Sequence, residues 1–337
     1  MLVVKGGMHV AKSDLKRHLV IGSAGQIGTE LVMALRKRYG NDNVVAMGRK
    51  TAPSDAVKNS GPWEWGDITD PPSIVNVIKK YDIDTIYNMA AILSAAGEKN
   101  PGLAWNVNIN GLYNLLEIAR EYKLKRVVVP SSIAAFGPET PQFNTPQETV
   151  LKPRTMYGVT KVAGELLCDY YFRKFEVDCR GLRYPGIISS EVLPGGGTTD
   201  YAVEIFYEAI KNKKYTCFLN ENSTLPMMYM PDCLNATIML TEADIKKLKH
   251  HSDFNLAACS FNPKELAVEI KKHIPEFKID YKPDFRQAIA DSWPKTIDDT
   301  AARQEWGWKH QFGLKEMTKD MIEKLTPRLL GDKKKKR

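Results

Sequence analysis

Tyr157 and Lys161 are the residues of this sequence whose types and spacing best suit a chemical step. They stand four positions apart in Met156-Tyr-Gly-Val-Thr-Lys161, where the apolar spacing that follows predicts a helix, so both project from one face of it. A free tyrosine has a pKa of about 10, and a neighbouring ammonium group lowers that pKa because it favours the phenolate. This pair can therefore take a proton from an alcohol.

Ser132 completes the predicted catalytic set, because it follows the apolar run 125–130 and its hydroxyl can donate to the oxygen that Tyr157 deprotonates. Hydride leaving the carbon needs a nicotinamide beside these groups, since no side chain accepts hydride. A Tyr–Lys pair at this spacing also arises by chance, and Ser131-Ser132 can simply cap a turn. The chemical interpretation therefore depends on the elements around these residues.

A glycine-rich turn near the N-terminus predicts a phosphate site. His18–Ile21 is a short apolar run typical of a buried strand, and the spacing of apolar residues from Ile27 to Leu35 predicts a helix ending near Tyr39. Between them stand Gly22, Gly25 and Gly28. Glycine lets the backbone turn tightly and approach a ligand, and a helix N-terminus attracts a diphosphate. The alternative is a glycine-rich strand-to-helix turn without a ligand.

The chain then repeats strand and helix. The apolar runs predict strands at 44–47, 85–91, 125–130 and 180–187, and helices at 73–81, 106–122 and 157–174. The strands are too apolar to alternate, which indicates a parallel sheet covered on both faces. The sequence thus predicts an α/β, doubly wound parallel sheet of the Rossmann type. The loop 93–97 follows a strand at the edge where such sheets bind ligands.

The end of the second predicted strand bears on the choice of cofactor. An acid here usually bonds the adenosine ribose, but this sequence has Met47-Gly48-Arg49. Arg49 can instead accept the extra phosphate of NADP, or can be an exposed loop cation. Asp67 can accept a hydrogen bond from the adenine amine, and Ile68 can cover the ring.

Composition excludes several classes of function. The chain has 337 residues with 43% hydrophobic content, enough for one or two domains, and no apolar run reaches the about 18 residues of a membrane helix. Its net charge of +8 owes much to the basic stretch 333–337, so we predict no nucleic-acid partner. Five dispersed cysteines without a C-x-x-C argue against zinc or another metal and for a reducing compartment. The basic residues 1–17 leave the mitochondrial matrix open beside the cytoplasm.

This order of motifs resembles the short-chain dehydrogenase/reductase superfamily, in its extended form, over residues 18 to about 325. Ser132, Tyr157 and Lys161 match its catalytic set, and Ser132 is favoured over Ser131 because it stands four residues before Phe136-Gly137. The resemblance implies NAD as cofactor. The residues that it places at NAD are Gly22, Gly25, Gln26, Ile27, Gly28, Asp67, Ile68, Met89, Ala90, Ala91, Asn108, Tyr157, Lys161, Tyr184 and Pro185.

Segments in both halves narrow the resemblance to one branch, the short-chain-type L-threonine 3-dehydrogenases. They are 91–95, 130–138, 193–201 and 292–298. This branch implies NAD-dependent oxidation of the L-threonine hydroxyl to 2-amino-3-oxobutanoate. Exposed N–H groups of the glycine-rich stretch 193–199 can bind a carboxylate, and Asp200 can balance an ammonium, although Asp200 can also cap the next helix. The implied substrate residues are Ser94, Ser132, Tyr157, Gly186, Thr198, Thr199, Asp200 and Trp293.

Two alternatives remain open. A sugar-nucleotide epimerase or dehydratase would hold a second diphosphate, yet residues 186–230 contain no arginine. A non-catalytic NAD-binding regulatory protein would keep the glycine turn without needing Tyr157 or Lys161.

We predict two domains. The NAD-binding domain comprises 18–188 and 230–262, and a smaller substrate-binding domain comprises 189–229 and 263–330, with basic tails at 1–17 and 331–337. Members of the resembled superfamily commonly pair through the helices equivalent to 106–122 and 157–174, so the resemblance implies a homodimer.

Overall fold

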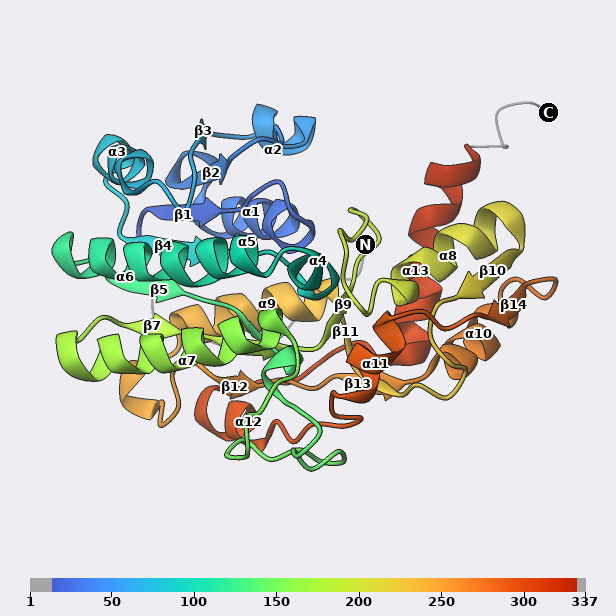
Figure 1. Cartoon of the computed structure of the whole chain (residues 1–337). Helices are drawn as coiled ribbons and strands as arrows, with labels where there is room; N and C mark the ends of the chain where they lie inside the picture. Colours follow the sequence, from blue (N-terminus) through green and yellow to red (C-terminus); the bar gives the residue numbers. More distant parts are fainter. Residues whose placement is uncertain (1–13, 332–337) are drawn as a thin grey trace.

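The largest sheet in residues 14–331, the part of the chain that the computed structural model describes, is parallel throughout (Figure 1). Its strand order is β3-β2-β1-β4-β5-β7. These strands are β1 (His18–Ile21), β2 (Val44–Gly48), β3 (Trp63–Trp65), β4 (Thr85–Asn88), β5 (Arg126–Val128) and β7 (Cys179–Arg180). The chain moves outward from β1 to β3 and then returns to β4, which makes β1 and β4 the switch point where such sheets bind ligands. The predicted Rossmann-type sheet is confirmed.

Helices cover both faces of this sheet, as the apolar strands require. One face carries α1 (Gln26–Tyr39) and α9 (Met230–Glu242), and the other carries α3 (Pro71–Tyr81), α6 (Gly111–Glu121) and α7 (Met156–Phe175) (Figure 1). Along β1 the side chains alternate: Val20 packs with Leu31 of α1, while Leu19 packs with Leu115 of α6.

Two predictions of local structure between β4 and β5 are wrong. Residues 94–97, predicted as a loop, form the start of α4 (Ser94–Lys99). These residues are small, so the sequence shows none of the apolar spacing that is typical of a helix. The helix predicted at 106–122 starts earlier, with α5 (Pro101–Trp105), and passes through a π-helical turn at 106–110 before α6. α4 contacts the start of α7 near Gly97, where a Cβ would make an ordinary contact 3.9 Å from Cβ of Tyr157.

The predicted strand at 180–187 is three strands in three different sheets. Gly181 and Pro185 separate β7, β8 (Leu182–Tyr184) and β9 (Gly186–Ile188). A Cβ on Gly181 would lie 2.3 Å from the carbonyl oxygen of Ser252, so the backbone bends closely past a neighbouring segment. Residues 254–261 likewise form two strands in different sheets, β12 (Phe254–Asn255) and β13 (Cys259–Phe261). An apolar run alone cannot show such a change of sheet.

The described residues form three smaller sheets as well, two of which contain these divided strands. One has the order β12-β8-β6, with β6 at Ser131–Ser132, and another the order β13-β11-β9, with β11 at Leu225–Tyr229. The third pairs β10 (Lys214–Cys217) with β14 (Lys278–Tyr281) in parallel. Figure 1 shows β10 and β14 beside α8, α10 and α13, away from the six-stranded sheet.

A second large core lies among α8 (Tyr201–Asn212), α10 (Pro263–Lys271) and α13 (Leu314–Leu330). It reaches Tyr157, so the two halves of the molecule meet near the start of α7. The division into two domains at 189, 230 and 263 stays a prediction. The remaining helices are α2 (Asp55–Asn59), α11 (Arg286–Asp291), α12 (Thr300–Trp306) and short 3₁₀ turns at 41–43, 133–135 and 245–247.

The predicted tails lie mostly outside the described residues, at 1–13 and 332–337. The end of the first one is anchored, contrary to its prediction as a tail: Arg17 Nη1 donates to Asn43 Oδ1 at 2.7 Å, and Lys16 N donates to Asp84 Oδ2 at 3.0 Å. Within 14–331, none of the helices combines the length and the apolar character needed to cross a membrane.

Candidate functional site

The glycine turn after β1 has the geometry of a ligand cradle. Gly22 has φ of +81°, and a Cβ there would lie 2.7 Å from the backbone nitrogen of Ala90 at the end of β4. A Cβ on Gly28 would lie 2.2 Å from the carbonyl oxygen of Gly22. No side chain caps α1, whose N-cap residue is Gly25, and its first turn carries no acid. The helix N-terminus therefore keeps the donors and the positive end of its dipole for an anion.

A cavity of about 240 Å³ runs from this turn to the start of α7. It collects most of the predicted site residues from seven separate segments of the chain. Those lining it are Gly25, Gln26, Ile27, Gly28, Met89, Ala91, Ser94, Ser132, Tyr157, Lys161, Tyr184, Pro185, Gly186, Thr198, Thr199, Asp200 and Trp293. Among the described residues that line it, Lys161 and Asp200 are the only ones with charged side chains, and arginine and histidine are absent.

The first turn of α7 brings Tyr157 to Ser132. A Cβ on Gly158 would lie 2.2 Å from the carbonyl oxygen of Ala134, so only glycine allows this approach. Thr155 caps the helix by accepting a hydrogen bond from Gly158 N at 3.0 Å. Ser132 Oγ accepts a hydrogen bond from Ala134 N at 3.2 Å, and Lys161 Nζ donates to the carbonyl oxygen of Pro130 at 2.6 Å.

The predicted lowering of the Tyr157 pKa by Lys161 is wrong for this structure. Burial raises the pKa of Tyr157 to about 12, although its hydrogen bond with Ser132 acts in the opposite direction. The ammonium of Lys161 lies 5.4 Å from the centroid of the Tyr157 ring and is bonded to Pro130, so it does not offset the loss of solvation. Burial also lowers the pKa of Lys161 to about 8.

The glycine-rich stretch 193–199 is organised by Asp200. Asp200 Oδ2 accepts hydrogen bonds from Gly196 N at 2.9 Å and Gly197 N at 2.8 Å. These two N–H groups, which we expected to bind a carboxylate, are therefore already bonded. Burial raises the pKa of Asp200 to about 6, and the two backbone donors limit that rise. Asp200 makes no side-chain cap of α8, so the alternative capping role is also wrong.

Hydroxyl groups face each other across this side of the cavity. Ser94 Oγ and Thr198 Oγ1 are 3.1 Å apart, although 104 residues separate them in the chain. Gln26 Nε2, from the glycine turn, donates to the carbonyl oxygen of Val192 at 3.3 Å. Trp293, implied as a substrate residue, is 5% exposed, belongs to the second core and also lines the cavity.

Five predicted cofactor residues do not line the cavity: Gly22, Asp67, Ile68, Ala90 and Asn108. Gly22 shapes the turn. Asn108 is used inside the protein, where its amide bonds the backbone of Ile92 in both directions and donates to Thr160 Oγ1 at 3.0 Å.

Asp67 lies away from the cavity, beside Arg49. Its Oδ1 accepts from Thr69 N at 2.9 Å, and its Oδ2 lies 3.3 Å from Arg49 Nη1. Burial acts to raise its pKa, but the bonds from Thr69 and Arg49 hold the pKa below its usual value. Arg49 is 46% exposed at its side chain, so the cation considered for a cofactor phosphate is a surface group paired with an acid.

Sequence reasoning missed several lining residues. Leu93, Ile133, Ile187 and Pro194 supply apolar wall, and Pro130 supplies the carbonyl that holds Lys161. Leu93, Ile133 and Ile187 each adjoin a residue predicted for the site, while Pro130 and Pro194 lie in the segments 130–138 and 193–201, and these are the signals that could have indicated them.

The chain is similar to known proteins over most of its length. Residues 18–257 match the NAD dependent epimerase/dehydratase family. The chain belongs to this family. A relative from Staphylococcus haemolyticus, named only as an uncharacterized epimerase/dehydratase, is 50% identical over 309 residues, which cover 91% of this chain and 97% of that protein. Membership indicates a nicotinamide cofactor and the chemistry of an oxidoreductase.

Solved structures similar to this family member include L-threonine dehydrogenases. The enzyme from Clostridium difficile is 51% identical with a TM-score of 0.91, and the match covers 94% of this chain and 99% of that one. An L-threonine 3-dehydrogenase from a metagenome is 47% identical with a TM-score of 0.89, covering 93% and 99%. The latter is described as monomeric, so the comparisons do not support the predicted homodimer. The mitochondrial location gains no support either, since the staphylococcal relative is bacterial.

Proposed function

We propose that this chain oxidises L-threonine at its side-chain hydroxyl to 2-amino-3-oxobutanoate, with NAD as the hydride acceptor. The observation that carries the proposal is the cavity itself. It presents Tyr157, Ser132 and Lys161 on one side and Asp200 with Thr198 on the other, within a lining that holds neither arginine nor histidine. That combination suits a small zwitterion with an alcohol group.

The glycine turn fits a dinucleotide. The turn is so tight that any Cβ on Gly22 or Gly28 would collide with the backbone, and the start of α1 has no side-chain cap. Both features favour binding of a diphosphate against the backbone N–H donors. Gln26, Ile27, Met89 and Pro185 would border the cofactor between this turn and Tyr157. When bound, NAD supplies the hydride acceptor that no side chain can provide.

The side chains of α7 and β6 would carry the proton. Tyr157, as phenolate, would accept the proton of the substrate hydroxyl, and Ser132 would donate a hydrogen bond to the same oxygen. Because burial raises the pKa of Tyr157, the phenolate depends on the hydrogen bond with Ser132, the contact that lowers this pKa.

The opposite wall would recognise the amino acid. Asp200, buried and held by Gly196 and Gly197, would pair with the ammonium. The Ser94 and Thr198 hydroxyls can donate to the carboxylate in place of the backbone groups that Asp200 occupies. Trp293 would exclude water from the reacting carbon.

A sugar-nucleotide epimerase is the second candidate, because the family description and the names of the curated relatives point to epimerases and dehydratases. Its substrate carries a second diphosphate, which proteins usually hold with arginine or lysine. Lys161 is the only cation that residues 14–331 contribute to the cavity lining, and its ammonium already bonds Pro130. This lack of cationic partners favours L-threonine.

One assay separates the candidates. Purified protein with NAD and L-threonine should produce the absorbance of NADH, whereas UDP-glucose in place of threonine should give neither NADH nor UDP-galactose. Epimerisation without threonine oxidation would overturn the proposal.

Tyr157→Phe supplies the test of mechanism. The variant should lose at least about 1,000-fold in kcat, since it removes the base, while the Kd for NAD measured by fluorescence stays within about twofold. Near-normal kcat in Tyr157→Phe would refute the assigned base, and absence of all turnover in the wild type would favour a regulatory NAD-binding protein.

A further inference from the structure

Glu165 continues the row of ionisable residues that begins with Tyr157 and Lys161. The three stand four residues apart on α7, so they occupy one face over successive turns. Glu165 is only 7% exposed, although charged residues are rarely buried without a partner. The proposed reaction gives it no role, which raises the question of what its buried carboxylate does.

Three successive turns of α7 hold three successive residues of the neighbouring segment. Lys161 Nζ donates to the carbonyl oxygen of Pro130 at 2.6 Å, Glu165 Oε1 accepts from the hydroxyl of Ser131, and Tyr157 faces Ser132. Ser131 and Ser132 together are the whole of β6. The position of the Ser132 hydroxyl therefore depends on how β6 is fastened to α7.

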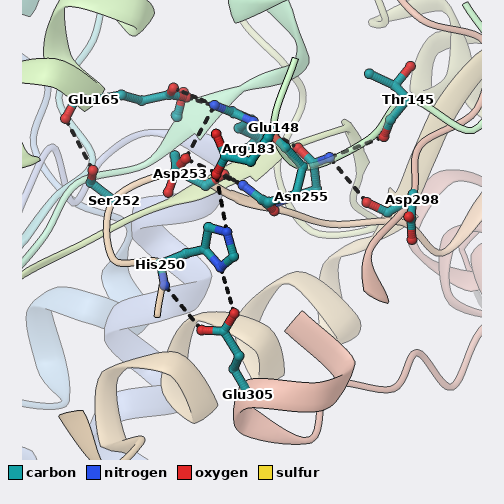
Figure 2. Close-up of polar contacts among 12 residues, drawn as sticks. Thr145, Glu148, Glu165, Arg183, His250, Ser252, Asp253, Asn255, Asp298 and Glu305 are labelled. Carbon is teal, nitrogen blue, oxygen red and sulfur yellow. Dashed lines mark hydrogen bonds and ion pairs between the residues drawn. The ribbon is translucent and has the colours of Figure 1, made fainter. Parts of the chain in front are cut away.

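Arg183 of β8 fixes the orientation of the Glu165 carboxylate. Arg183 Nε donates to Oε1 at 2.9 Å and Arg183 Nη2 to Oε2 at 2.8 Å, a bidentate ion pair that Figure 2 shows. Arg183 is also the register partner of Ser131 in the sheet β12-β8-β6. Arg183 Nη1 makes two further hydrogen bonds, donating to the carbonyl oxygen of Gln147 at 3.0 Å and to Asn255 Oδ1 at 3.2 Å.

We propose that Glu165 is a positioning residue for the reaction, which fastens β6 to α7 through Ser131 and thereby sets where Ser132 meets the substrate oxygen. This role rests on the proposed function of Ser132 and Tyr157.

The same carboxylate acts on Lys161 through its charge. Burial lowers the pKa of Lys161, and the negative charge of Glu165 one turn away opposes that effect. A cavity of about 20 Å³ lies between them, lined by both residues and Ser131. The other ionisable groups facing this region are Cys168 on α7, Arg183 on β8 and Asp253 before β12.

Glu165→Gln tests the charge while keeping an acceptor for Ser131. The pKa of Lys161 can be measured without substrate, by NMR of the ¹³C-methylated enzyme with Lys161→Arg for assignment. We expect that pKa to fall by about one unit and kcat for threonine to fall about tenfold or more, with the Kd for NAD within about twofold. The alkaline limb of kcat/KM should move to lower pH, because the charged lysine is lost sooner. A folded variant with unchanged Lys161 pKa and kcat would overturn the proposal.

Two further variants keep the outcome unambiguous. Asp169→Asn on the same helix breaks an exposed pair with Arg173 and should leave pKa and kcat unchanged. If Glu165→Gln does not fold, Ser131→Ala is the deciding variant, because it leaves the ion pair between Glu165 and Arg183 intact. A fall of about fivefold or more in kcat with unchanged NAD binding would support the positioning role of Glu165. A kcat equal to that of the wild type would overturn it. If the wild type does not oxidise threonine, the proposed function fails, while the NMR comparison still tests the effect of Glu165 on Lys161.

Discussion

At the scale of single residues, burial dominates the chemistry of this site. It raises the pKa of Tyr157 to about 12, and the hydrogen bond with Ser132 is the contact that lowers it. Removing that contact should therefore raise the pKa of the base further. In Ser132→Ala the acidic limb of kcat/KM should shift to higher pH, and kcat should fall about 100-fold at pH 7. A pH–rate profile measures both, and an acidic limb at the same pH as in the wild type would contradict the assigned contact.

Arg49 bears on cofactor choice at the same scale. Its guanidinium is exposed and paired with Asp67, and the end of β2 has glycine in place of an acid. NAD should remain the better cofactor because the Asp67 carboxylate repels the extra phosphate of NADP. The preference for NAD over NADP should still be weaker than it would be with an acid in place of Gly48. Arg49→Ala should lower kcat/KM for NADP by roughly tenfold, because it removes about one charge-assisted hydrogen bond. The kcat/KM for NAD should stay nearly unchanged. A wild-type preference for NADP would refute this interpretation.

At the scale of elements, the approach of α1 to β1 makes the cofactor turn. A Cβ on Gly28 would lie 2.2 Å from the carbonyl oxygen of Gly22, and a backbone atom cannot swing aside as a side chain can. Gly28→Ala should widen the turn and weaken NAD binding about tenfold or more, since overpacking costs about 1–3 kcal/mol. Gly195→Ala is the matched control, because a Cβ there meets nothing within 4 Å. Isothermal calorimetry with NAD compares the two, and equal affinities would contradict the clash.

At the scale of the whole molecule, one segment joins the two halves beside the cavity. Ser189 Oγ donates to Glu30 of α1, and Arg328 of α13 donates to the carbonyl oxygen of Ser190 at 2.6 Å. Burial raises the pKa of Glu30 from 4.5 to about 7. Glu30 therefore ionises at a lower pH in the unfolded chain than in the folded protein. As pH rises from about 4.5 to 7, this difference lowers the free energy of unfolding progressively, by roughly 3 kcal/mol in total.

Glu30→Gln removes that dependence. The free energy of unfolding of the variant should exceed that of the wild type increasingly between pH 4.5 and 7, and urea melts at several pH values measure the difference. Glu323→Gln, at a side chain that is 63% exposed, is the control. A constant difference between Glu30→Gln and wild type across this range would show that Glu30 ionises normally in the folded protein.

The sequence by itself was sufficient for the features that depend on local pattern. Apolar runs and helical spacing predicted β1, α1, α7 and the parallel sheet, because strands and helices bury their side chains with different periods. The spacing of glycines predicted the turn after β1, since only glycine tolerates its close contacts.

Only the tertiary structure decided which groups are already bonded and how solvent is excluded. Asn108 and the N–H groups of Gly196 and Gly197 looked available in the sequence, yet each already bonds a partner inside the protein. The division of 180–187 among three sheets depends on contacts with distant segments such as Ser252. The pKa of Tyr157 follows from burial and from the direction in which Lys161 points, and both are properties of packing, which composition and spacing do not encode.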